Sequence, residues 1–187
     1  ELIHNTNEKL SATESKMEAL RNITERYDGY GNSIRRVMEQ KQWNPGIIGV
    51  VADIITVNQK YEVAVETALG GSIQNIVTED DATAKRMISY LKTNRLGRAT
   101  FLPLNTITDR GSVRNDVLRE KGVIGVASDL VEVDSKFNTL VKNLLGRIIV
   151  VDNIDNALAV ARKNNQSLRL VTIEGELINP GGSMTGG

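Results

Sequence analysis

The stretch Gly46-Ile47-Ile48-Gly49-Val50-Val51-Ala52-Asp53-Ile54-Ile55-Thr56-Val57 recurs later in the chain as Gly122-Val123-Ile124-Gly125-Val126-Ala127-Ser128-Asp129-Leu130-Val131-Glu132-Val133. Gly, Ile, Gly, Val, Asp and Val match in place between the two copies. Self-similarity of this kind indicates a duplicated structural unit. Each copy is a short, β-branched apolar run, and helical patterns follow it, which is typical of a mixed α/β domain.

The repeat continues beyond these two stretches. Tyr61, Val65, Leu69 and Gly70 correspond to Phe137, Val141, Leu145 and Gly146. Each half is then predicted to form a strand, a helix and a further strand: 73–77, 80–92 and 99–102 in the first, and 147–151, 155–163 and 168–172 in the second. We therefore predict two α/β halves, related by a pseudo-twofold axis and joined by the polar stretch 105–121. The sheet edges of such units need partners.

The N-terminal residues 1–27 carry apolar residues at heptad spacing, interrupted by several threonines. This pattern indicates either the end of a longer coiled coil or an amphipathic helix packed on its own domain. A shorter helix is predicted over 33–42, with Ser33 as its N-cap and Ile34, Val37 and Met38 on its apolar side. The predicted domains are an arm stub with its entry helix (1–42), a first subdomain (43–119) and a second subdomain (120–187).

The composition limits the classes of function. The 187 residues are 40% hydrophobic, and 23 basic residues balance 23 acidic ones, so any nucleic-acid contact must come from a local patch. There is no cysteine, which excludes disulfides and thiolate metal sites and fits a reducing cytoplasm. The chain has no apolar run of about 18 residues and no signal peptide, so neither a membrane span nor secretion is predicted.

Glycines crowd the end of the chain, in Asn179-Pro180-Gly181-Gly182-Ser183-Met184-Thr185-Gly186-Gly187. Gly181 and Gly186 have the separation of a phosphate loop, but Gly187 stands where that motif requires lysine. Two alternatives remain, a disordered tail and backbone that another group approaches closely, within the chain or across an interface.

Catalytic candidates are few. Asp53 and Asp129 occupy the same position in the two copies of the repeat, but an aspartate after a strand commonly accepts hydrogen bonds from turn amides. The acidic run 79–81 could hold magnesium or cap the next helix. His4 is the only histidine, so no Ser-His pair can form. We predict no catalytic residue, no cofactor and no metal, and neither hydrolysis nor binding of ATP.

Four stretches carry a family resemblance: Gly49–Ile55, Glu66–Val77, Gly97–Leu104 and Gly175–Gly187. They resemble the hinge of structural maintenance of chromosomes (SMC) proteins, most closely that of bacterial condensin. The resemblance covers 46–187 and implies the SMC hinge fold. Such a hinge dimerises two chains at the far end of long coiled-coil arms, in a ring or rod, while the ATPase heads lie elsewhere. It also implies that the N-terminal heptads are the top of one arm.

The resemblance also suggests site residues. The glycines that would allow two backbones to approach at a homodimer interface are Gly70, Gly71, Gly181, Gly182, Gly186 and Gly187. DNA, often single-stranded, would contact basic residues, for which the candidates are Arg35, Arg36, Lys41, Arg98 and Arg169. Solvated surface charge is the alternative explanation of those five. Accessory condensin subunits would bind elsewhere in the full-length protein, which would be cytoplasmic and associated with the nucleoid. A free-standing nucleotide or small-ligand domain is the rival class.

Overall fold

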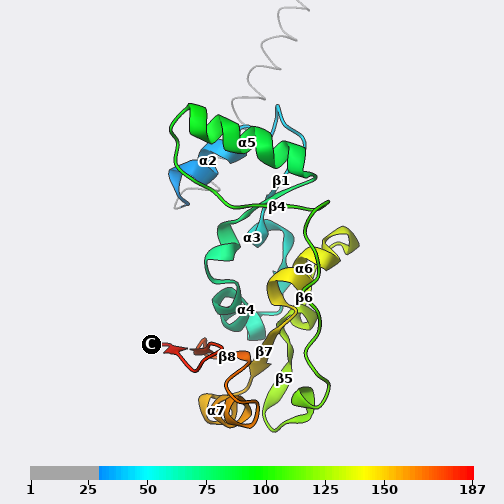
Figure 1. Ribbon diagram of the computed structural model, residues 1–187, viewed down its shortest axis with the longest axis vertical. Helices are drawn as coiled ribbons and strands as arrows, with labels where there is room; N and C mark the ends of the chain where they lie inside the picture. The colour runs from blue at the N-terminus through cyan, green and yellow to red at the C-terminus, as the bar shows by residue number, and fades with distance from the viewer. Residues whose placement is uncertain (1–29) are drawn as a thin grey trace, which may run out of the picture. The chain divides into compact units, whose positions relative to one another are not determined.

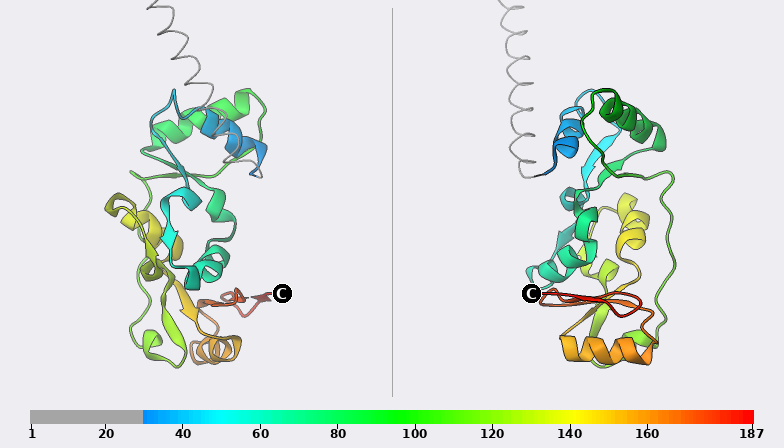
Figure 2. Two further views of the ribbon diagram at one scale, coloured as in Figure 1. Left: turned by 180° about the vertical axis from the view of Figure 1, so that it is seen from behind. Right: turned by 60° about the vertical axis from the view of Figure 1, so that its left-hand side comes forward.

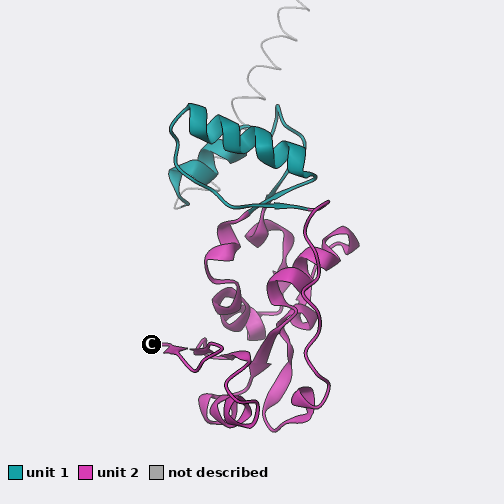
Figure 3. Ribbon diagram, in the orientation of Figure 1, with its two compact units in different colours: residues 1–49, 76–103 teal, residues 50–75, 104–187 magenta. Residues whose placement is uncertain are grey.

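A computed structural model describes residues 30–187 (Figure 1). The heptad prediction for 1–27 lies outside the described residues. The chain divides into two compact units, shown in Figure 3. In its described part, unit 1 comprises 30–49 and 76–103, and unit 2 comprises Val50–Asn75 and Leu104–Gly187. The residues between β1 and β3 therefore belong to the same unit as the second repeat. The predicted boundaries at 42/43 and 119/120 follow the repeat instead, and remain a prediction.

Unit 1 is a three-stranded sheet with two helices. The strand order is β1 (Ile47–Val50), β3 (Ile76–Thr78) and β4 (Phe101–Pro103), and β3 and β4 are parallel. The helices are α2 (Asn32–Glu39) and α5 (Asp81–Thr93). The predicted apolar side of α2 is confirmed, because Ile34, Val37 and Met38 are buried. Burial of such side chains supplies most of the stability of a short helix.

One detail of α2 was predicted wrongly. Its N-cap is Gly31, which makes no side-chain cap bond, and Ser33 lies one residue inside the helix. The Ser33 hydroxyl instead donates to the backbone oxygen of Arg98 at 2.7 Å. This contact joins residues far apart in the sequence, so no local capping rule could predict it.

Unit 2 is built on a five-stranded sheet. Its order is β10 (Met184–Thr185), β9 (Leu177–Ile178), β8 (Arg169–Thr172), β7 (Ile148–Val151) and β5 (Val123–Val126). Strands β7 and β8 are parallel, and the other neighbours are antiparallel. Helix α7 (Ile154–Lys163) packs along β7, β8 and β9 (Figure 2). Ile149, Leu170, Ala157 and Val160 form the core between them.

The predicted duplication is confirmed element by element. The first half contains α3 (Val51–Ile54), β2 (Thr56–Val57), η1 (Gln59–Tyr61) and α4 (Glu62–Leu69). The second has η4 (Ala127–Leu130), β6 (Val131–Glu132), η5 (Ser135–Phe137) and α6 (Asn138–Leu145) in the same order. The equivalent strands β2 and β6 pair antiparallel with each other, Thr56 opposite Glu132. Two matching strands paired in this way are what a local twofold relation produces.

The remaining elements of unit 2 are two short 3-10 helices, η2 (Gly70–Gln74) and η3 (Val117–Arg119). The strand predicted over 73–77 therefore begins only at Ile76, after η2. Among the described residues, no helix is both long enough and apolar enough to span a bilayer.

Candidate dimerisation surface

The glycine-rich end of the chain forms a hairpin. Strands β9 and β10 pair, with Met184 opposite Ile178, and the amide of Gly182 donates to the oxygen of Asn179 at 2.9 Å. Pro180 and Gly181 thus occupy the two central positions of a β-turn, and Gly181 has a φ of +93°. Proline followed by a glycine of positive φ is characteristic of a type II turn. The turn within the chain therefore explains a glycine at position 181.

The outer side of this hairpin is an open sheet edge. Strand β10 lies at the end of the strand order and pairs with β9 alone among the described strands. Gly186 and Gly187 follow it and are exposed, and the Met184 side chain is 52% exposed. An open edge offers unpaired backbone donors and acceptors to another chain. A half-exposed methionine beside it adds apolar surface that a partner would bury.

The other candidate glycines lie at the end of α4. Gly70 is the C-cap of this helix, with φ +54° and ψ −132°, and its amide donates to Glu66. Gly71 follows in η2, is exposed, and has no positive φ. A Cβ atom added to Gly71 would meet nothing within 4 Å. Neither backbone conformation nor packing within the described chain therefore explains a glycine at position 71.

The glycine at position 175 provides the contrast. Gly175 lies between β8 and β9, with φ +92°, and an added Cβ would come within 2.9 Å of Val63 Cγ1 on α4. This glycine allows the turn after β8 to pack against α4. It is a structural glycine, whereas Gly71 is free of such constraints.

The five candidate DNA-contacting residues lie in both units. Arg35 and Arg36 are on α2, and the Lys41 ammonium donates to the Ile48 oxygen at 2.7 Å. Arg36 pairs with Glu39 at 3.7 Å, and a hydrogen bond with Tyr90 raises the pKa of its guanidinium. The Arg35 Nε is buried without a hydrogen-bond partner. Arg35, Arg36 and Lys41 lie in one short stretch of sequence, and the hydrogen bond from Ser33 to the backbone oxygen of Arg98 links Arg98 to the start of that stretch.

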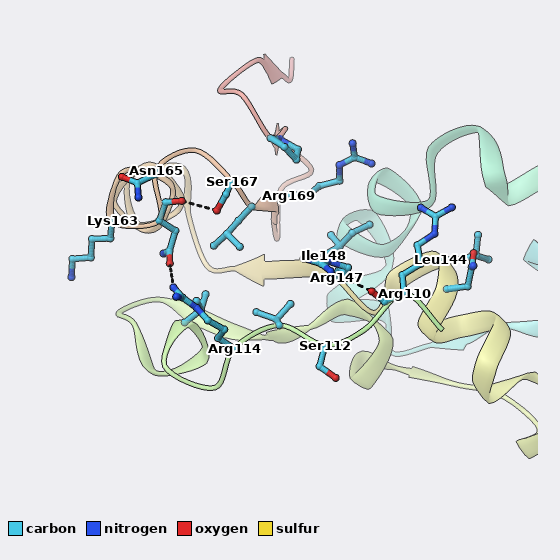
Figure 4. Close-up of a pocket in the computed structure, with 16 residues that line it drawn as sticks. Arg110, Ser112, Arg114, Leu144, Arg147, Ile148, Lys163, Asn165, Ser167 and Arg169 are labelled. Atoms are coloured by element: carbon cyan, nitrogen blue, oxygen red, sulfur yellow. Dashed lines mark hydrogen bonds between the residues drawn. The ribbon is translucent and has the colours of Figure 1, made fainter. Parts of the chain in front are cut away.

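Arg169, the fifth candidate, lies in unit 2 at the start of β8. It lines an open cavity of about 580 Å³, together with Arg110 and Arg114 from the connection after β4 and with Arg147 and Lys163 (Figure 4). Sequence reasoning missed these four basic residues. They come from three separate stretches of the chain, and only the fold brings these stretches around one cavity.

Two of the carboxylates considered in the sequence analysis, Asp53 and Asp80, have structural roles. Asp53 accepts a hydrogen bond from the amide of Val50 at 3.4 Å, as expected for an aspartate after a strand. Asp80 caps α5, accepting from the Thr83 amide at 2.8 Å, which confirms the capping interpretation of the acidic run. Within residues 30–187, no three His, Asp or Glu side chains are grouped as metal ligands.

A duplicated α/β unit with an open strand edge and exposed glycines is typical of an association module. The family described as the SMC proteins flexible hinge domain matches residues 44–161. The chromosome partition protein Smc of Lactiplantibacillus plantarum is 42% identical over 92% of this chain, and that of Bacillus subtilis is 40% identical over the same share. The chain belongs to the SMC hinge family.

Solved structures agree. The hinge domain of Geobacillus stearothermophilus SMC superposes with a TM-score of 0.82 at 36% identity, covering all of this chain and 77% of that one. The Pyrococcus furiosus hinge domain gives 0.70 at 37% identity, covering 93% of this chain and 90% of that one. The mixed α/β hinge fold predicted from the sequence is confirmed. The chain spans about 15% of the length of the curated relatives it matches.

Proposed function

We propose that this chain is the homodimerisation hinge of a chromosome-condensation SMC protein. It joins two coiled-coil arms into a ring or rod, carries no catalysis of its own, and contacts DNA. The observation that carries the dimer is Gly71, an exposed glycine with no conformational or packing reason inside the chain. The open edge of β10 supports it, and so does the Geobacillus relative, whose structure is an asymmetric dimer.

Close backbone approach is the shared role that we propose for the six candidate glycines, in addition to the conformational roles of Gly70 and Gly181 within the chain. Where two chains meet, glycines on both sides would allow the main chains to come close. One chain would contribute Gly70 and Gly71, and the other Gly181, Gly182, Gly186 and Gly187. Closed homo-oligomers commonly use twofold symmetry, in which each contact occurs twice. We therefore assign these six glycines to two equivalent interfaces of one homodimer.

Sedimentation tests this proposal. The parent should sediment at about twice the 20.5 kDa chain mass. Gly71→Glu places a charge where two backbones meet. An unpaired buried charge costs about 3–5 kcal/mol, so the dissociation constant of the dimer should rise at least about 100-fold. Ala159→Glu is the control, because it adds the same charge at an exposed position on α7. A monomeric parent, or a Gly71→Glu variant that dimerises as well as the control, would contradict the proposal.

DNA contact is assigned to Arg35, Arg36, Lys41, Arg98 and Arg169. The chain has no net charge and few aromatic residues, so we expect weak binding through phosphates with little sequence preference. Arg36 and Lys41 are the residues to neutralise, since both are exposed whereas the Arg35 Nε is buried.

In the full-length protein, condensin subunits would bind elsewhere. The full-length protein would lie in the cytoplasm, at the nucleoid.

A salt titration with a labelled oligothymidylate tests the DNA assignment. Arg36→Gln/Lys41→Gln should weaken binding, and the slope of log K against log salt should become shallower by about 1 for each phosphate that is no longer neutralised. Lys85→Gln/Lys121→Gln removes the same charge from exposed positions elsewhere. If the two double variants have equal affinities and equal slopes, Arg36 and Lys41 do not contact the DNA.

A further inference from the structure

The cavity lined by Arg169 has an unusual set of side chains. Four segments of unit 2 form it: the connection after β4, the junction of α6 and β7, the turn from α7 to β8, and Pro180 between β9 and β10. Five of its lining residues are basic, namely Arg110, Arg114, Arg147, Lys163 and Arg169, and none is acidic or aromatic. In a chain with as many acidic as basic residues, this is a local excess of positive charge.

Hydrogen bonds hold part of this set in place. The Arg114 Nη2 donates to the Asn164 Oδ1 at 3.1 Å, and Asn164 is itself only 9% exposed and donates to Glu120 and to the oxygen of Val160. The Arg147 Nη1 donates to the oxygen of Arg110 at 3.2 Å. Figure 4 shows both bonds, and Lys163 extending outward at the rim. The guanidinium groups are therefore partly positioned before any ligand arrives.

The turn beside the cavity is strained. Asn165 and Gln166 have φ values of +56° and +57°, a conformation that costs energy in residues other than glycine. The backbone amide of Gln166 donates to the backbone oxygen of Ala161. The backbone oxygen of Gln166 accepts from the amide of Gly181 at 2.7 Å. These and further backbone hydrogen bonds hold the turn. Asn165 and Ser167 of this turn line the cavity. Strained backbone of this kind clusters at ligand sites.

Few carboxylates neutralise these cations. Arg114 pairs with Asp116 at 3.5 Å, but both side chains are more than 70% exposed, so a stronger anion can displace that pair. Arg110, Arg147, Lys163 and Arg169 make no ion pair with any residue of the described chain. An oxyanion in the cavity would relieve their mutual repulsion.

We propose that this cavity binds consecutive phosphate groups. Arginine forks match phosphate oxygens with two parallel bonds, and the hydroxyls of Ser112 and Ser167 supply further donors. The lining contains no aromatic ring on which a base could stack, so we expect no strong preference for a nucleoside polyphosphate over an inorganic one. The ligand is a free polyphosphate or the backbone of a nucleic-acid strand. Arg169 also belongs to the proposed DNA contact, whereas the other four cations of the cavity do not. The site does not depend on dimerisation.

Calorimetry with inorganic tripolyphosphate at low salt tests the site. We expect one tripolyphosphate per chain, and binding at least about tenfold weaker in the cavity variant Lys163→Gln/Arg169→Gln. Both residues are exposed and make no side-chain hydrogen bond among the described residues, so the fold should be retained. Arg119→Gln/Arg162→Gln is the control, because it removes the same charge at exposed positions outside the cavity. The control should change affinity less than about twofold.

Competition distinguishes the two sources of phosphate. If an oligothymidylate displaces tripolyphosphate from the parent, a nucleic-acid strand occupies the site, and if it does not, a free polyphosphate does. Either result supports the proposal when the cavity variant alone is impaired. Absence of tripolyphosphate binding by the parent, or equal reductions in the cavity and control variants, would overturn it. A variant with an altered circular dichroism spectrum would be replaced by Arg110→Gln, whose side chain makes no hydrogen bond within the described chain.

Discussion

At the scale of single residues, the folded chain explains one glycine of unit 2, and the proposed dimer accounts for another. Gly175 is needed by the folded chain itself, because of its positive φ and its closeness to Val63. Gly71 has neither constraint within the described chain. Under the proposed function, its role is close backbone approach at the dimer interface.

Alanine substitutions should separate these two reasons. Gly175→Ala strains the backbone and crowds α4, so the free energy of unfolding should fall by about 1–3 kcal/mol. Gly71→Ala should leave the stability of the separated chain within about 0.5 kcal/mol of the parent, as for other unconstrained surface positions. Urea unfolding at one chain concentration, low enough for the chains to be separate, measures both. A large loss of stability in Gly71→Ala would show a constraint inside the chain.

Residue-level prediction succeeded where the chemistry is local. Asp80 belongs to the acidic run that was considered as a helix cap, and it accepts a hydrogen bond from the amide three residues later. Ser33 failed because its hydroxyl found the oxygen of Arg98, 65 residues away. Sequence rules predict hydrogen-bond partners that lie a few residues away, but not partners that only the fold brings close.

At the scale of elements, the equivalent helices α5 and α7 are capped by different chemistry. The carboxylate of Asp80 accepts from the Thr83 amide and also from its hydroxyl. The cap of α7 is the neutral amide of Asn153. The backbone bond from Thr83, followed by its side-chain bond, lowers the pKa of Asp80.

This difference predicts a different response to acid. Because the folded pKa of Asp80 is depressed, its stabilisation is complete above the ordinary aspartate pKa of about 3.9 and is lost as pH falls through the lower, folded value. The destabilisation caused by Asp80→Ala should therefore shrink as pH falls below about 4. Asn153→Ala should cost about 0.5–2 kcal/mol at every pH. Thermal unfolding between pH 7 and pH 3 gives both differences, and a parallel decline for the two variants would refute the assignment.

Prediction of the elements was most accurate where the apolar pattern was long. Helices α5 and α7 begin and end within one residue of the predicted bounds. The pattern failed near glycine, where Gly70–Gln74 form a 3-10 helix and Met184–Thr185 form a strand. Two-residue strands carry too little pattern to be recognised, and the pairing of β10 depends on the turn at Gly181.

At the scale of the whole molecule, the repeat predicted a duplicated α/β fold because both copies kept the same apolar positions. It could not show that α3, β2 and α4 pack in one unit with the second copy, since that depends on β2 pairing with β6. The phosphate cavity was beyond sequence reasoning for the same reason. Arg110 and Arg114 lie in a polar connection, and only the folded chain places them beside Arg147 and Lys163.

The backbone of Gly70, with φ +54° and ψ −132°, has a consequence that concerns handedness. Reversing both signs gives the extended backbone that ordinary L-residues prefer, so Gly70 adopts the mirror image of a common conformation. A D-amino acid would favour it, whereas every chiral residue in the genetic code opposes it. At Gly71, a larger side chain could be accommodated by a smaller one in the partner. At Gly70 no change elsewhere can compensate, because the strain is confined to the residue itself.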